Sequence, residues 1–283
     1  MRWNLSSRAR SLSHGDATVL SIPKSGRTWL RTFVSAYFSG QIGRPFSIDI
    51  TDIGGEDVPR IIYSHDRFEH RTKANSWERL RGKYLVPRAQ LNRAPIILLA
   101  RDPRDAFVSY YVQLTRRNHP APESIKRMSA DALLRHPRFG ISSMAVVMNI
   151  WVAEFGARDD FRIVRYEDLR ADPAGAFTNV LRALGEEQIG EEAFSEALQF
   201  SSFENMQSLE ARGEFGDKIL TARDPEDPES FKVRRGKVGA FEEYLSRESL
   251  DFAAHICEKL DSAFGYAVAP AVRVQSDATR RTQ

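Results

Sequence analysis

Short apolar runs bounded by turn residues recur along the chain and alternate with longer amphipathic stretches. The runs are rich in β-branched residues and nearly continuous, which is typical of strands buried on both faces of a parallel sheet. Four such strands are predicted, over 18–22, 60–64, 95–100 and 161–166. Their alternation with helices favours a single α/β domain with a central parallel sheet flanked by helices.

Helix signals fill the segments between these strands. Asp102 followed by Pro103 is a typical N-cap and first-turn pair, and it predicts a helix through about Arg116. The same pair of residue types recurs at 172–173. Further helices are predicted over 30–38, 142–158, 177–184 and 246–264.

Composition limits the class of protein. A chain of 283 residues with 42% hydrophobic residues can bury a sizeable core. The net charge of +3 is too balanced for a general nucleic-acid binder. The single cysteine, Cys257, excludes an internal disulfide and fits a reducing compartment. With no apolar run long enough to span a bilayer and no secretory signal, a cytoplasmic location is predicted.

The ends differ in composition from the middle. Residues 1–15 form a basic N-terminal segment, 16–268 the predicted domain, and 269–283 a tail predicted to be disordered. A segment rich in Asp, Pro and Glu, over 217–229, predicts a mobile loop. Oligomeric state is not readable from the sequence.

The stretch Ser21-Ile22-Pro23-Lys24-Ser25-Gly26-Arg27-Thr28-Trp29 joins the first strand to a helix. Backbone N–H groups converge at a helix N-terminus, where the macrodipole favours negative charge. Gly26 permits close approach of the backbone to an anion. The Gly-Lys-Ser/Thr order of an ATP-binding P-loop is absent, because Lys24 precedes the glycine. The stretch therefore predicts a phosphate or sulfate site, against the alternative of an ordinary strand-to-helix connection.

Two further basic motifs accompany this loop. Arg101 ends the third strand, where ligands lie in open α/β sheets, and Ser109 follows two turns into the next helix. A guanidinium with a hydroxyl suits a phosphate, although Arg101 could equally pair with a nearby aspartate. The third motif, Arg234-Arg235-Gly236-Lys237-Val238-Gly239, is another basic turn. Three such motifs indicate a ligand with two separated anionic groups.

In detail these motifs resemble those of the cytosolic sulfotransferase family. Pro23-Lys24-Ser25-Gly26-x-Thr28-Trp29 is similar to its 5′-phosphosulfate loop, the stretch 101–111 to its 3′-phosphate motif, and 234–239 to its C-terminal Arg-Lys-Gly-x-x-Gly segment. Smaller similarities at 166–169 and 201–206 fall in the same order. The resemblance runs from about 18 to 241 and implies a P-loop-like, nucleotide-kinase-like sulfotransferase fold.

The resemblance implies 3′-phosphoadenosine 5′-phosphosulfate as donor, adenosine 3′,5′-bisphosphate as product, and no metal. Lys24 would stabilise charge on the bridging oxygen as its bond to sulfur breaks. The 5′-phosphate would be held by Ser25, Gly26, Arg27 and Thr28. The 3′-phosphate would be held by Arg101, Ser109, Arg234, Arg235 and Gly236. The adenine would lie among Trp29, Tyr166 and Phe203, and Ser201 completes the donor-binding residues.

The general base implied by the resemblance is His65, directly after the second strand. A neutral imidazole with an ordinary pKa of about 6.5 suits this role. The sequence departs from the family pattern at Tyr63, where a lysine is common, and at Arg27, where Thr or Ser is usual. Ser64 replaces a Thr, and 240–242 replace the usual Asp-Trp-Lys.

Two other functions fit parts of the sequence. A nucleotide-dependent phosphotransferase on a P-loop-like fold would need ATP and Mg²⁺. A non-catalytic nucleotide-binding module would make the position of His65 accidental. The acceptor of a sulfotransferase is predicted to be a carbohydrate, a glycolipid or another polar hydroxyl compound, because polar and basic residues dominate the expected acceptor side. These are Arg67, Arg71, Lys73, Arg79, Arg81, Lys83 and the stretch 116–127.

Overall fold

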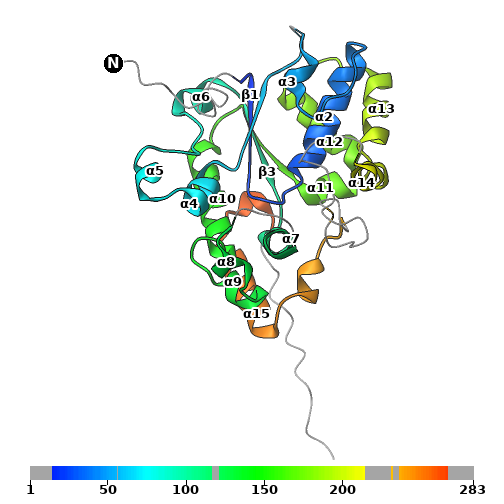
Figure 1. Cartoon of the computed structure of the whole chain (residues 1–283). Coiled ribbons are helices and arrows are strands. Elements are labelled where there is room, and N and C mark those ends of the chain that lie inside the picture. Colours follow the sequence, from blue (N-terminus) through cyan, green and yellow to red (C-terminus); the bar gives the residue numbers. More distant parts are fainter. Residues whose placement is uncertain (1–14, 56, 117–120, 214–230, 232–235, 267–283) are drawn as a thin grey trace, which may run out of the picture.

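The computed structural model describes residues 15–55, 57–116, 121–213, 231 and 236–266. In this part of the chain, four parallel strands form a sheet in the order β2-β1-β3-β4 (Figure 1). The strands are β1 (Ala17–Ser21), β2 (Ile61–Ser64), β3 (Ile96–Ala100) and β4 (Phe161–Arg165). The four predicted strands and their parallel arrangement are confirmed.

Side chains of successive strand residues point to opposite faces of the sheet and enter two separate cores. Val19 and Ile97 pack into one core, whereas Leu20 and Leu98 pack into the other. The first core is covered by α2 (Arg27–Gln41), α3 (Ile50–Ile53), α11 (Tyr166–Ala171), α12 (Pro173–Ala183) and α13 (Glu191–Phe200). The second is covered by α4 (Asp66–Lys73), α6 (Arg88–Arg93), α7 (Pro103–Arg116), α8 (Glu123–Lys126), α9 (Ala130–Leu134), α10 (Ile141–Phe155) and α15 (Arg247–Cys257). The result is the three-layer α/β architecture expected from the sequence (Figure 1).

Smaller elements complete the structure. Helix α14 (Phe203–Arg212) places Met206 in a small cluster with Ile48. Helix α5 (Ser76–Leu80) buries none of its residues. Two 3-10 turns cover Ala240–Glu243 and Ser262–Phe264. The loop predicted over 217–229, the tail 269–283 and all but the last residue of the basic N-terminal segment 1–15 lie outside the described residues.

The single helix predicted over 246–264 is wrong in extent. Ser246 caps α15, but the helix ends at Cys257 and a 3-10 turn follows at 262–264. The cause is a contact with α10. Asn149 donates to the carbonyl of Lys259 at 2.7 Å and accepts from the N–H of Asp261 at 2.9 Å. These bonds hold the chain in a turn that a continuous helix could not form.

The order of the strands determines where a ligand can bind. From β1 the chain crosses to β2 on one side, whereas from β3 it crosses to β4 on the other. The carboxyl ends of β1 and β3 therefore flank a topological switch point, where the helices leave a crevice. The loop after β1 and Arg101 after β3 both lie at this point.

Cys257 makes the stability of this fold depend on alkaline pH. Its side chain is buried in the second core, and burial raises the pKa of the thiol to about 12. In the unfolded chain the thiol ionises near its ordinary value, so the unfolded state gains stability as pH rises between these two values. We expect the free energy of unfolding to fall with pH in this window, with Cys257 contributing up to about 1.4 kcal/mol per pH unit.

Urea unfolding of the wild type and of Cys257→Ala between pH 8 and 11 measures this contribution. The variant should be less stable at pH 8 because of lost packing, but its stability should fall less steeply with pH. Parallel pH dependences for the two proteins would contradict the assignment.

Candidate active site

The loop after β1 has the backbone geometry of an anion cradle. Lys24 and Gly26 both have positive φ, 69° and 92°, and Gly26 is the N-cap of α2. A Cβ on Gly26 would lie 2.8 Å from Cδ2 of Tyr166, so only glycine fits. A left-handed lysine is uncommon and is a form of strain found at functional sites. The N-terminus of α2, where a helix favours negative charge, therefore follows directly on this loop.

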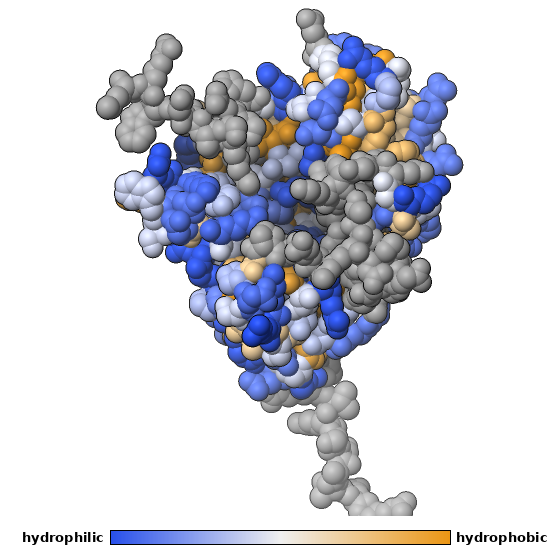
Figure 2. Space-filling model, in the orientation of Figure 1, coloured by the Kyte–Doolittle hydropathy of each residue, from blue (hydrophilic) through white to orange (hydrophobic). Residues whose placement is uncertain are grey.

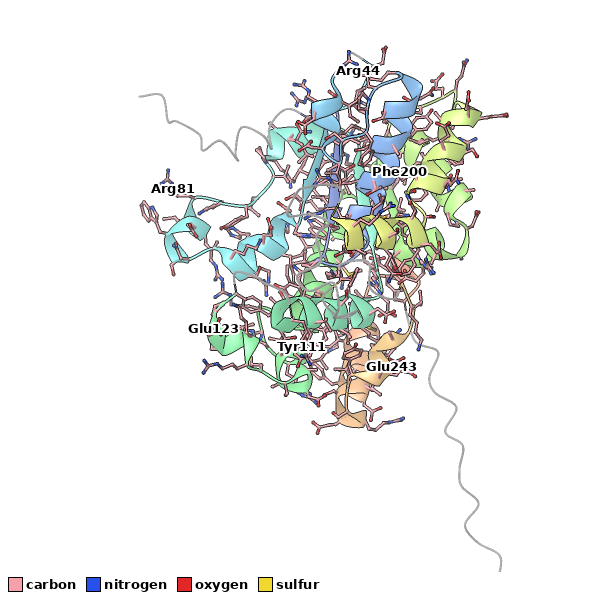
Figure 3. The ribbon with its side chains drawn as sticks, turned by 45° about the vertical axis from the view of Figure 1, so that its right-hand side comes forward. Arg44, Arg81, Tyr111, Glu123, Phe200 and Glu243 are labelled. Carbon is pink, nitrogen blue, oxygen red and sulfur yellow. The ribbon has the colours of Figure 1, made fainter. Side chains whose placement is uncertain are left out.

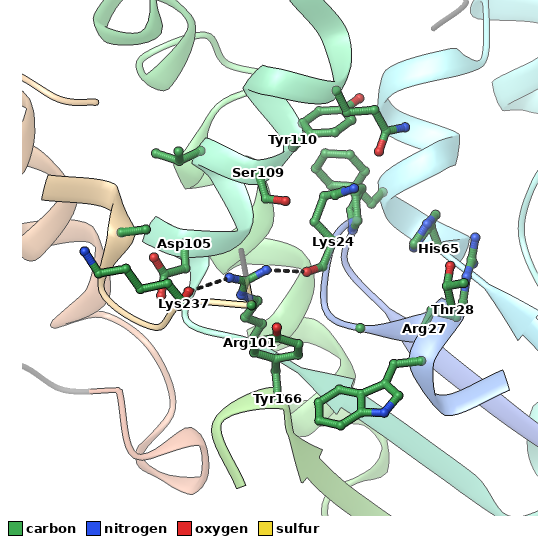
Figure 4. A pocket seen from close by; sticks show the side chains of 18 of the residues that line it. Lys24, Arg27, Thr28, His65, Arg101, Asp105, Ser109, Tyr110, Tyr166 and Lys237 are labelled. Carbon is green, nitrogen blue, oxygen red and sulfur yellow. Dashed lines mark hydrogen bonds between the residues drawn. The ribbon is translucent and has the colours of Figure 1, made fainter. Parts of the chain in front are cut away.

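A cavity of about 280 Å³ lies at the switch point and collects most of the predicted site residues. Figure 4 shows Lys24, His65, Arg101 and Ser109 around this cavity. The predicted residues that line it are Lys24, Gly26, Arg27, Thr28, Trp29, His65, Arg101, Ser109, Tyr166, Phe203 and Gly236. Ser25 and Ser201 are buried and do not line it, and Arg234 and Arg235 lie outside the described residues.

Arg101 connects the two sides of the cavity. Its guanidinium donates to the carbonyl of Lys24 at 3.0 Å and to that of Lys237 at 3.4 Å (Figure 4). It also lies over the ring of Tyr166, 4.3 Å from its centroid. The pairing with a neighbouring aspartate that the sequence left open is not seen among the described contacts, because the carboxylate of Asp102 pairs with Arg104 instead.

Asp105 holds the C-terminal turn against α7. Its carboxylate accepts from the N–H of Gly239 at 2.7 Å and from that of Phe241 at 3.3 Å. Burial raises the pKa of Asp105, whereas these two donors and the nearby charge of Arg101 oppose the rise. Gly236 and Lys237 are thereby brought to the cavity by a contact between residues 134 positions apart in the sequence.

Aromatic rings form the end of the cavity beyond Arg101. Trp29 and Tyr166 meet edge to face, with centroids 6.0 Å apart. Arg170 lies 5.9 Å over Trp29 and 5.2 Å over Phe203, and so links the two rings. The absence of a Cβ on Gly236 lets the chain approach Phe203, since a Cβ there would lie 2.8 Å from its ring. Flat aromatic and guanidinium groups of this kind suit a planar heterocycle.

Two residues that line this cavity have a buried polar atom without a hydrogen-bond partner within the described part of the chain: Trp29, at Nε1, and Arg101, at Nε. Oγ of Ser201, which does not line the cavity, is a third such atom. Buried donors are rarely left without a partner, and each such group calls for an explanation. All three residues were assigned to nucleotide binding from the sequence, so the residues present fit a bound nucleotide.

His65 lies at the start of α4, on the opposite side of Lys24 from Arg101 (Figure 4). Its Nδ1 lies 2.7 Å from the carbonyl oxygen of Ser21 and 3.2 Å from the hydroxyl of that residue. A carbonyl only accepts, so Nδ1 carries the proton and the neutral ring has its lone pair on Nε2. This is the form that a general base requires.

Beyond His65 the cavity runs between one face of α4 and one face of α7. Helix α4 contributes Phe68, Glu69, Thr72 and Lys73, and α7 contributes Val108, Ser109, Tyr110 and Gln113. Glu69 is buried and pairs with Lys73 at 2.8 Å. Burial raises the pKa of Tyr110, and the charge of Glu69 raises it further. This end combines apolar and polar groups, and its wall contains an ion pair between buried Glu69 and exposed Lys73.

Sequence reasoning missed Glu69, Thr72 and Gln113 in this wall. The signal was present in the spacing, because residues 65, 69 and 72 repeat at the interval of helical turns. Of the basic residues predicted to face the acceptor in 67–83, only Lys73 lines the cavity. Others are occupied elsewhere: Arg67 pairs with Glu154, Arg71 donates to Ser143, and Lys83 pairs with Glu78.

Tyr63, which stands where a lysine was expected, does not reach the cavity. It packs against the first core, and burial raises the pKa of its phenol. Two cations act on it: Arg31, whose guanidinium lies 5.1 Å from its ring, and Arg27. Arg27 also lines the cavity and lies beside Thr28 and His65 (Figure 4). The chain therefore lacks the expected lysine at position 63 but has an additional cation, Arg27, at the cavity.

The described residues contain no group of three His, Cys, Asp or Glu side chains that could hold a metal ion. Nor do they include a helix with the length and apolarity needed to cross a bilayer.

Comparison with curated proteins identifies distant relatives. The chain is 24% identical over 243 residues to the amine sulfotransferase of Oryctolagus cuniculus, with 82% of this chain and 76% of the relative covered. It is 23% identical over 257 residues to the flavonol 3-sulfotransferase of Flaveria bidentis, covering 83% and 78%. Identity to cytosolic sulfotransferase 17 of Arabidopsis thaliana is 26% over 253 residues, covering 82% and 70%.

Solved structures share the fold. A mouse sulfotransferase complexed with PAP superposes with a TM-score of 0.58 at 18% identity, covering 89% of both chains. A retinol dehydratase in complex with androsterone and PAP gives 0.53 at 16% identity, covering 87% of this chain and 81% of that one. The model of the sulfotransferase domain family matches residues 14–265, which include every described residue of the cavity. The chain therefore belongs to the sulfotransferase family, as its motifs predicted.

Proposed function

We propose that this enzyme moves the sulfuryl group of 3′-phosphoadenosine 5′-phosphosulfate to the hydroxyl of a polar acceptor. The observation that carries the proposal is one cavity lined both by the aromatic residues Trp29 and Phe203 and by the candidate base His65. Lys24 lies in this cavity between Ser109 and His65 (Figure 4). Structures with the same fold were solved with PAP, the product that such a donor leaves.

The 3′-phosphoadenosine 5′-phosphosulfate would occupy the end of the cavity where Nε1 of Trp29 and Nε of Arg101 have no hydrogen-bond partner among the described residues. The loop 24–28 would take the 5′-phosphate, and Arg101 with Ser109 the 3′-phosphate. The adenine would lie against Trp29 and Phe203, where Arg170 holds both rings. When bound, the donor supplies the sulfuryl group.

The chain supplies positioning, charge and a base. Nε2 of His65 takes the proton of the acceptor hydroxyl as that oxygen attacks. The ammonium of Lys24 offsets the negative charge that grows on the leaving phosphate, as cations do in enzymes that transfer phosphoryl groups. The bond from Nδ1 of His65 to Ser21 keeps the ring in the required tautomer.

Calorimetric titration tests the donor. We expect adenosine 3′,5′-bisphosphate to bind at least tenfold more tightly than ATP, without Mg²⁺, and Arg101→Gln to abolish that preference. A preference for ATP with Mg²⁺ would favour a phosphotransferase. Binding that weakens steeply with salt and does not depend on Arg101 would indicate a non-catalytic module.

The acceptor proposal rests on the cavity, because the names of the relatives range from an amine to a flavonol sulfotransferase. A buried carboxylate, Glu69, lies one turn from His65, and Thr72, Lys73 and Gln113 are its neighbours along the cavity. Carboxylate, hydroxyl, ammonium and amide groups spaced by helical turns suit an acceptor with several hydroxyls, such as a saccharide. Phe68 and Val108 give its ring a partly apolar floor.

Glu69→Gln is expected to raise the KM for the polar acceptor about tenfold, because a hydrogen bond to a charged group is worth about 1.5–3 kcal/mol. Affinity for adenosine 3′,5′-bisphosphate should not change. Steady-state kinetics after an acceptor screen with labelled donor gives both values.

Glu123→Gln is the matched control. Glu123 also pairs with a lysine, Lys126 at 2.9 Å, but it lies on α8 and does not line the cavity (Figure 3). Its kinetics should match the wild type. Sulfation of simple phenols alone, unaffected by Glu69→Gln, would overturn the acceptor proposal.

A further inference from the structure

A protruding segment beside the acceptor end of the cavity carries an exposed apolar pair. The segment, residues 74–83, contains α5 and is the outermost of the described residues on the left of Figure 1. Trp77 is 65% exposed and Leu80 is 78% exposed, the two highest values among large apolar side chains of the described residues. Single exposed apolar residues are ordinary, but these two stand one helical turn apart on the same helix.

The segment is firmly built although it has no core. Asn75 and Glu78 form a capping box at the start of α5. Arg79 donates to the carbonyls of Ala74 at 3.2 Å and Arg71 at 2.7 Å, which closes the loop on α4. Specific hydrogen bonds therefore hold α5 in place, and the exposure of Trp77 and Leu80 does not result from a frayed helix end.

Positive charge surrounds this pair. Arg79, Arg81 and Lys83 are exposed within the segment, and Figure 3 shows Arg81 at its outer edge. The same corner of the surface is blue to pale in Figure 2. Glu78, which pairs with Lys83, is the only acidic residue within the segment 74–83. An aromatic and a leucine among lysines and arginines suit the headgroup region of an anionic bilayer.

Three guanidiniums gather where the segment meets the body. Arg79 and Arg138 both donate to the carbonyl of Arg71, at 2.7 Å each, and Arg71 donates to the hydroxyl of Ser143 at 3.1 Å. All these partners are neutral oxygens. Burial lowers the pKa of Arg138, and the charges of Arg79 and Arg71 lower it further. Among the described contacts these three guanidiniums have no acidic partner, so phosphate headgroups would be attracted to their charge.

We propose that residues 74–83 dock on the surface of an anionic phospholipid bilayer, with Trp77 and Leu80 entering the headgroup region and the surrounding arginines contacting lipid phosphates. Lys73, the last residue of α4, lines the cavity two residues before α5 is capped. Docking would therefore turn the acceptor end of the cavity towards the bilayer. This last step rests on the proposed function and indicates a lipid-linked polar acceptor, whereas docking itself does not depend on it.

Sedimentation of the full chain with vesicles tests docking without donor or acceptor. We expect binding to phosphatidylcholine vesicles that contain 30% phosphatidylglycerol, little binding to phosphatidylcholine alone, and weaker binding at higher salt. Trp77→Ala/Leu80→Ala should weaken binding about tenfold or more. Arg81→Gln should weaken it about fivefold, the effect of about 1 kcal/mol per basic residue near such a surface.

Two matched variants lie away from the segment. Val146→Ala removes another exposed apolar side chain, from α10, and Arg247→Gln removes an exposed charge from α15. Both should bind vesicles as the wild type does. The emission of Trp77 should shift to the blue on vesicle binding, a shift that Trp77→Phe loses while it still sediments with vesicles.

Several results would overturn docking. These are no binding to anionic vesicles, equal binding to neutral ones, or wild-type binding by the double variant. A doubled mass in analytical ultracentrifugation that Trp77→Ala/Leu80→Ala abolishes would show that the pair binds a second copy instead. If docking is confirmed but adenosine 3′,5′-bisphosphate does not bind, the proposed function is wrong, whereas the docking proposal is supported.

Discussion

His65→Asn is expected to lower kcat by a factor of about 10²–10⁴, the contribution typical of a positioned general base. Asparagine can keep the bond that the wild-type ring makes, because its amide N–H can donate to the carbonyl of Ser21 in place of Nδ1. It has no group that can take a proton at the position of Nε2. The loss should therefore appear in turnover, while the affinity for adenosine 3′,5′-bisphosphate and the unfolding temperature stay close to wild type.

His255→Ala controls for the loss of a histidine as such. His255 lies exposed on α15 and contacts Glu258 at 3.3 Å. Turnover with the labelled donor should be unchanged in this variant. If His65→Asn keeps more than about a tenth of wild-type turnover, another group takes the proton and the assignment of the base is wrong.

Lys24→Ala is expected to lower kcat by a factor of about 10²–10³, by analogy with the loss of one donor to a developing oxyanion. The side chain lines the cavity between Ser109 and His65 (Figure 4). Because catalysis of such transfers depends mainly on positioning and electrostatic stabilisation, the missing ammonium should lower turnover more than it weakens donor binding.

The left-handed backbone of Lys24 allows a second variant that separates charge from conformation. With φ at 69°, the position suits glycine better than alanine, so Lys24→Gly should be the more stable of the two by about 0.5–1 kcal/mol. Both should lose turnover equally if the ammonium matters. Recovery of turnover in Lys24→Gly would mean that the loop conformation, and not the charge, had been lost in Lys24→Ala. Lys126→Ala, on α8, should behave as wild type.

Local patterns of the sequence determined the strands, most helix starts and the anion loop. The strands were readable because a parallel sheet buries both of its faces and leaves continuous apolar runs. The loop was readable because its backbone needs a glycine at one position, where Gly26 faces Tyr166. The proposal of His65 as the base came from the resemblance to the sulfotransferase family, in which a histidine follows the second strand, and His65 lies directly after β2 in the structure.

The tertiary structure alone decided how these parts meet. The strand order put the loop after β1 beside Arg101, and Asp105 drew the C-terminal turn to them across more than 130 residues. Such contacts depend on which elements pack together, and the residues next to each element in the sequence do not encode that. For the same reason Glu69 and Lys73 line the cavity and the other basic residues predicted in 67–83 do not, because the rotation of α4 on the core selects which side chains reach it.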